Sequence, residues 1–158
     1  MHSFGNSPAD SLQEELKATR QLLQLLKQEQ AYLIEANVDG LASLTEEKAK
    51  IVARMSELAR WRHNALAAVG FAAKEEGMQK WLKSPAANFT AGDAWKELLA
   101  LAQAGKNLNR TNGLLIGRHM ARNQAALNVL HGGAQGGALY GRDGQTTTKS
   151  AARGLVVG

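Results

Sequence analysis

The chain has 158 residues, a net charge of +5 and no cysteine. Its length is typical of one domain with a modest core, and the lack of cysteine excludes disulfides, thiolate metal sites and cysteine nucleophiles. No apolar run approaches the roughly 20 residues of a membrane span, and the N-terminus lacks the features of a signal peptide. We therefore expect a cytoplasmic protein without direct membrane insertion.

The first part of the chain has the apolar spacing of a long helix, which we place at about residues 8–36. Pro8 suits the first turn of this helix. Ser11 and Glu14 have the spacing of a capping box just downstream. The apolar residues that recur every three or four positions are Leu12, Leu16, Leu23, Leu26 and Leu33.

A turn is expected at residues 37–40, because Asn37 can end a helix and Asp39 can cap the next one. A second long helix follows at about 39–69. A seven-residue register runs through this turn, so one continuous helix is the alternative. The apolar residues of the second helix include Leu41, Leu44, Ile51, Met55, Leu58, Ala65 and Val69.

A short helix near residues 71–83 should pack against the bundle end. It is followed by a loop that contains Pro85 and Gly92. Asp93 is the candidate N-cap of a third long helix at about 93–130. The apolar stripe of this helix consists of Leu98, Leu101, Leu108, Leu115, Ile116, Met120, Leu127 and Leu130.

The third helix has weak intrinsic propensity, because asparagines and the glycines at 105, 113 and 117 interrupt it. It therefore needs partners, in its own chain or in another. The segment after Leu130 has six glycines between residues 132 and 144 and reads as a flexible tail. We thus predict an all-α protein. Residues 1–130 form an elongated bundle of three long helices and one short helix, and 131–158 form the tail.

Catalytic and metal chemistry find no support in the sequence. The four histidines lack the spacing of a helical metal site, and no nucleophile has an identifiable base. We expect no enzyme, no metal and no cofactor. Trp61 between Arg60 and Arg62 is the best nucleic-acid candidate. The alternative is that Trp61 packs at the bundle edge while the arginine stems cover apolar surface.

Three stretches of the sequence resemble the FlgN family, the flagellar type III export chaperones of the hook–filament junction proteins. The first runs from Leu44 to Lys48, and the third from Leu139 to Gln145. The second and most specific covers residues 108–130. It contains Leu108, Asn109, Asn112, Gly113, Leu115, Ile116, Arg122, Asn123, Gln124, Ala126, Leu127 and Leu130.

This resemblance implies a cytoplasmic bacterial chaperone that binds the C-terminal regions of hook-associated proteins 1 and 3. It would prevent their premature polymerisation and deliver them to the type III export gate. The implied client-binding residues are Leu108, Asn109, Asn112, Gly113, Leu115, Ile116, Asn123, Ala126, Leu127 and Leu130. The implied contacts with the cytoplasmic domain of the gate protein FlhA are Leu139, Tyr140, Gly141, Asp143 and Gly144.

Other interpretations of the third helix stay open. One alternative is that its glycines and asparagines serve packing inside the monomer instead of client binding. Another alternative is that the helix pairs with its own copy in a homodimer. From a different class, the chain could be a coiled-coil structural or adaptor protein with weak nucleic-acid affinity through Arg60, Trp61 and Arg62.

Overall fold

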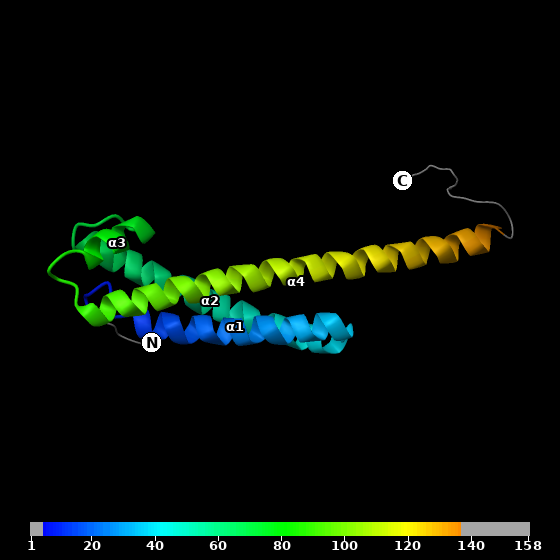
Figure 1. Ribbon diagram of the computed structural model, residues 1–158, viewed down its shortest axis with the longest axis horizontal. Coiled ribbons are helices and arrows are strands. Elements are labelled where there is room, and N and C mark those ends of the chain that lie inside the picture. The colour runs from blue at the N-terminus through cyan, green and yellow to red at the C-terminus, as the bar shows by residue number, and fades with distance from the viewer. Residues whose placement is uncertain (1–4, 137–158) are drawn as a thin grey trace. The chain divides into compact units, whose positions relative to one another are not determined.

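The computed structural model describes residues 5–136, which form four α-helices and no strand (Figure 1). The helices are α1 (Leu12–Glu35), α2 (Val38–Ala68), α3 (Glu75–Leu82) and α4 (Phe89–Gly136). The predicted all-α bundle of three long helices and one short helix is confirmed. The chain divides into two compact units, Met1–Gly113 and Leu114–Gly158, so that α4 contributes to both.

The start of α1 differs from the prediction. Residues 7–11 form turns, in which Asp10 accepts a hydrogen bond from the Ser7 backbone N–H at 2.9 Å. Ser11 occupies the N-cap position but makes no capping hydrogen bond with its side chain. Its hydroxyl instead donates to the buried carboxylate of Glu15 at 3.0 Å. The predicted capping box with Glu14 is therefore wrong, because Glu15 competes for the serine hydroxyl.

The turn between α1 and α2 is a full reversal, which excludes the single continuous helix. Ala36 adopts a left-handed conformation with φ 55° and ends α1. Asn37 then caps α2, its side-chain oxygen accepting from the Gly40 N–H at 2.9 Å. The cap is Asn37 and not Asp39, so α2 begins one residue earlier than predicted. The two helices lie side by side in Figure 1, and an ion pair of 2.7 Å joins Lys48 to Glu29.

Both ends of α4 extend beyond the predicted helix. Asn88 accepts a hydrogen bond from the Ala91 N–H at 2.8 Å, which starts α4 at Phe89 within the segment predicted as a loop. At the other end, residues 131–136 continue the helix although their glycine content placed them in the tail. The backbone hydrogen bonds of a long helix outweigh the weak propensity of the added glycines.

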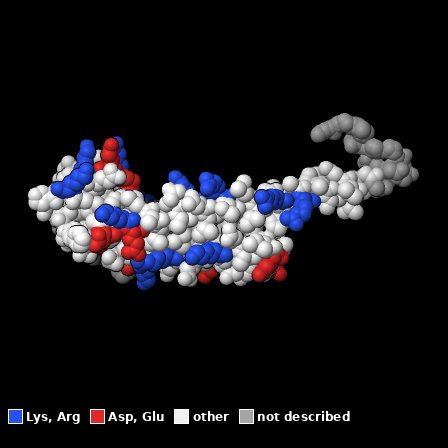
Figure 2. Space-filling view, viewed as in Figure 1, with Lys and Arg blue, Asp and Glu red and all other residues white. Residues whose placement is uncertain are grey.

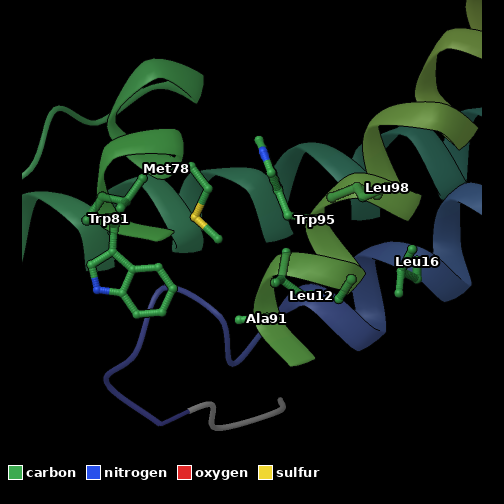
Figure 3. Packing of buried hydrophobic residues seen from close by; sticks show 9 residues of the cluster. Leu12, Leu16, Met78, Trp81, Ala91, Trp95 and Leu98 are labelled. Carbon is green, nitrogen blue, oxygen red and sulfur yellow. The ribbon is translucent and has the colours of Figure 1, made fainter. Parts of the chain in front are cut away.

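One apolar cluster joins all four helices (Figure 3), at the end of the bundle opposite the α1–α2 turn (Figure 1). The short helix α3 contributes Met78 and Trp81, both almost fully buried. The tryptophan Trp95 of α4 is 4% exposed. The cluster consists of Leu12, Leu16, Leu66, Met78, Trp81, Ala91, Ala94, Trp95 and Leu98.

A buried ion pair lies beside this cluster. The guanidinium of Arg62 on α2 donates to the carboxylate of Glu15 on α1, with Nε–Oε2 3.0 Å and Nη2–Oε1 3.2 Å. The two side chains are 4% and 7% exposed. The same guanidinium lies 4.7 Å from the ring centroid of Trp95 on α4, and 3.4 Å from the half-exposed carboxylate of Glu75 on α3. One arginine therefore connects all four helices.

Candidate functional site

The first half of α4 uses the predicted apolar stripe to pack against α1. Leu98 is buried in the core cluster. Gly105 faces α1 closely, because a Cβ added there would lie 3.7 Å from Leu23 and 4.0 Å from Leu26. An exposed ion pair between Arg20 and Glu97 joins the same helices. This half of the stripe is thus covered within residues 1–113.

Asn112 marks the end of this internal contact. Its side chain is 1% exposed, and its Nδ2 donates to the Leu26 carbonyl and to Glu29 Oε1, both at 2.9 Å. These hydrogen bonds connect α4 to α1. The structure therefore gives Asn112 the internal packing role that was the alternative to client binding.

The second half of the stripe, in the unit that begins at Leu114, has a different environment. We call its five apolar residues Leu115, Ile116, Met120, Leu127 and Leu130 the distal stripe. Leu115 is half-buried. Ile116 is 42% exposed, Met120 66%, Leu127 48% and Leu130 68%. A helix that presents so many large apolar side chains to solvent is typical of an interaction surface.

The remaining residues of the predicted client-binding set divide between the two units, with Leu108, Asn109 and Gly113 in the first and Asn123 and Ala126 in the second. Leu108 is half-buried. Exposed residues of the set are Asn109, Gly113, Asn123 and Ala126. No heavy atom outside their own helix backbone lies within 4 Å of a Cβ added at Gly113 or Gly117. Both glycines therefore leave room for the close approach of a partner helix.

In the part of α4 that begins at Leu114, two exposed apolar residues were not predicted. Leu114 is 64% exposed and Val129 is 73% exposed, but both lie off the three-to-four spacing that defined the stripe. Periodicity alone could not have indicated them. They show that apolar surface in this unit extends beyond one face of the helix.

The second predicted site, the possible contact with the export gate, lies outside the described residues. It comprises Leu139, Tyr140, Gly141, Asp143 and Gly144, all beyond Gly136. These residues remain a prediction from the sequence.

The nucleic-acid candidate on α2 loses one of its two cations. Arg62 is buried and paired with Glu15, so its guanidinium is not available to a phosphate in this structure. Trp61 is half-buried and Arg60 is exposed. The prediction missed this role of Arg62 because its partner Glu15 is 47 positions away in sequence.

Within the described part of the chain, no group of three or more His, Cys, Asp or Glu side chains is arranged to hold a metal ion. None of the four helices, as far as residues 5–136 define them, combines the length and the hydropathy required to cross a membrane.

Comparison with known proteins identifies the family. The FlgN family, described as FlgN protein, matches residues 1–148. The flagella synthesis protein FlgN of Yersinia enterocolitica is 30% identical over 137 residues, which cover 85% of each chain. The protein of the same name from Salmonella typhimurium is 31% identical, and the match covers 77% of this chain and 75% of the relative. The one from Escherichia coli K12 is 28% identical, and the match covers 89% of this chain and 90% of the relative. No solved structure matches the chain significantly. The chain therefore belongs to the FlgN family, whose named relatives are flagella synthesis proteins.

Proposed function

We propose that this protein is a cytoplasmic chaperone of flagellum assembly that binds the C-terminal regions of hook-associated proteins 1 and 3. It holds these subunits unpolymerised and delivers them to the type III export gate through the cytoplasmic domain of FlhA. Membership of the FlgN family supports the flagellar role. The observation that supports client binding is the exposure of the distal stripe on α4.

The chemistry of the distal stripe suits an amphipathic helix of the client. A partner helix that lies along α4 would place apolar side chains at i, i+3, i+4 and i+7 against Ile116, Met120, Leu127 and Leu130. Terminal segments of the junction subunits that become helical during assembly would then be masked by α4. Gly113 and Gly117 would let the partner backbone approach closely.

The size of the stripe sets a limit on what apolar burial alone can achieve. Complete burial of a Leu, Ile or Met side chain contributes about 1.5–3 kcal/mol. Covering the exposed fractions of the four exposed stripe residues therefore contributes roughly 3–7 kcal/mol. Association itself costs an estimated 4–15 kcal/mol or more. Polar or charged contacts must therefore add to the affinity.

The first test compares two aspartate substitutions at residues of equal exposure. Leu127 on α4 and Val52 on α2 are both 48% exposed. Each variant is co-expressed with a hook-associated protein, and the captured client is measured. Leu127→Asp should weaken capture at least about 10-fold, because it removes apolar contact and buries a charge. Val52→Asp should leave capture unchanged.

The double variant Leu115→Asp with Leu127→Asp should abolish co-purification, while circular dichroism stays helical. Normal client capture by this double variant would contradict the proposed site. Loss of capture by Val52→Asp alone would instead move the site to the groove of about 300 Å³ that Val52 lines between α1, α2 and α4.

The second test separates the gate from the client. Tyr140→Ala should weaken binding to the cytoplasmic domain of FlhA and leave client capture intact, since the tail motif and the distal stripe are different segments. A titration with the isolated gate domain measures this affinity. Unchanged affinity of the variant for the gate domain would refute the assignment of Tyr140.

A further inference from the structure

The part of α4 after Glu97 carries positive charge without any negative charge. No aspartate or glutamate occurs between Leu98 and Gly136, whereas Lys106, Arg110, Arg118 and Arg122 lie in this segment. All four cations are exposed, and none of them forms an ion pair with another described residue. Figure 2 shows only blue and white side chains on the described part of α4 that leads into the grey residues. This surface therefore has uncompensated positive charge.

Two of these arginines lie beside Leu115, at one edge of the distal stripe. Arg118 and Arg122 are four residues apart, so they lie one helical turn apart on the same side of α4. Leu115 precedes Arg118 by three residues, and Ala126 follows Arg122 by four. The four residues thus form one row, which adjoins the stripe at Leu115 and lies on a different side of the helix from Met120 and Leu127. A helix docked on the stripe would bring its own flank against this row.

The packing of α1 against the first part of α4 shows what kind of helix binds this side of α4. In residues 1–113, α1 covers this face with Leu23 and Leu26. Its Glu29 accepts a hydrogen bond from Asn112, and its Arg20 pairs with Glu97 of α4. The seven-residue spacing continues from Asn112 to His119 and Ala126. The partner that α4 binds within the chain is therefore a leucine-containing helix whose polar flank residues complement those of α4.

From these observations we propose that the distal stripe binds an amphipathic helix whose apolar row is flanked by acidic residues, which pair with Arg118 and Arg122. The proposal rests on the proposed chaperone function and specifies the chemistry of its client segment. It also supplies the charged contacts that apolar burial alone lacks.

Two other occupants fit the charge pattern less well. A second copy of α4 would bring the same uncompensated cations together, which opposes self-association along this stripe. A nucleic acid would neutralise the arginines but would leave the exposed Leu127 and Leu130 uncovered. The segment 96–136 also contains no Phe, Tyr or Trp on which bases could stack.

The experiment uses the full chain and two synthetic peptides of about 20 residues, long enough to span roughly 30 Å as a helix. Both peptides carry leucines at the same three-to-four spacing. One has glutamates and the other has lysines at the flanking positions. Affinities are measured in low salt and again in about 1 M salt, where charges are screened beyond roughly 3 Å.

We expect the glutamate peptide to bind the wild-type protein about 10-fold more tightly than the lysine peptide in low salt. In high salt most of this preference should disappear. The double variant Arg118→Glu with Arg122→Glu should reverse the preference. The matched control is Lys106→Glu with Arg110→Glu, which has the same spacing and changes the net charge equally. This control should keep the preference.

Equal binding of both peptides, or an equal effect of the two double variants, would overturn the proposal. Tighter binding of a single-stranded oligonucleotide than of the glutamate peptide would overturn it in favour of nucleic acid. Dimerisation that Leu127→Asp abolishes would overturn it in favour of a second copy. If the double variant Arg118→Glu with Arg122→Glu still captures the client, the proposed pairing with acidic client residues is refuted, whereas the proposed chaperone function is not. If the wild-type protein prefers the glutamate peptide but captures no hook-associated protein, only the assignment of the client is refuted.

Discussion

Replacing Arg62 by alanine should lower the free energy of unfolding of the bundle by about 3–5 kcal/mol. The substitution leaves the carboxylate of Glu15, 7% exposed, with the Ser11 hydroxyl as its remaining side-chain donor. A buried charge that loses its counter-ion keeps its desolvation cost and loses the attraction that offset it. The guanidinium contact with the Trp95 ring, at 4.7 Å, is lost as well.

The reverse substitution should cost less. Glu15→Ala leaves Arg62 with the carboxylate of Glu75 at 3.4 Å and with the face of Trp95. Because the Glu75 side chain is 55% exposed, solvent screens this second pair and limits its worth. The double variant Glu15→Leu with Arg62→Met removes both charges, and should come within about 1–2 kcal/mol of the wild type.

Urea denaturation measures these differences. Tryptophan fluorescence suits the experiment because Trp61, Trp81 and Trp95 all lie in residues 1–113, and circular dichroism provides a second probe. With a urea slope of about 1–3 kcal/mol per M, Arg62→Ala should lower the midpoint by about 1 M or more. A loss below about 1 kcal/mol, as for an exposed pair, would refute the reasoning. The reasoning would also be refuted if the double variant lost as much stability as the two single variants, Arg62→Ala and Glu15→Ala, lose together.

Two further predictions use matched substitutions at asparagines and glycines, both measured by denaturation. Asn112→Ala should cost about 1–3 kcal/mol, because the buried Leu26 carbonyl and the part-buried Glu29 carboxylate lose their donor, whereas the exposed Asn123→Ala should stay within about 0.5 kcal/mol. Equal effects would contradict the internal role of Asn112. Gly77→Ala should destabilise α3, because its Cβ would lie 1.8 Å from the Ala72 carbonyl oxygen. Gly117→Ala meets nothing within 4 Å and should stabilise α4 by about 0.5–1 kcal/mol. A stable Gly77→Ala protein would contradict the packing of α3.

The parts of this fold that depend on local sequence could be predicted. Apolar spacing identified the three long helices and the short one, because a helix places residues three and four apart on one side. The turn at residues 37–40 was predictable because asparagine and glycine favour helix ends. The ends were less certain. Ser11 could have capped α1, but the buried carboxylate of Glu15 takes its hydroxyl.

The tertiary structure decided which side chains are covered, and by what. Leu98, Asn112 and Leu130 belong to one periodic pattern in the sequence, yet the first two are buried and Leu130 is 68% exposed. Periodicity reports which side of a helix is apolar, but not where a neighbouring helix covers it. Arg62 likewise resembled a surface cation until the fold placed it against Glu15. Such assignments depend on contacts between residues distant in sequence, which no local pattern encodes.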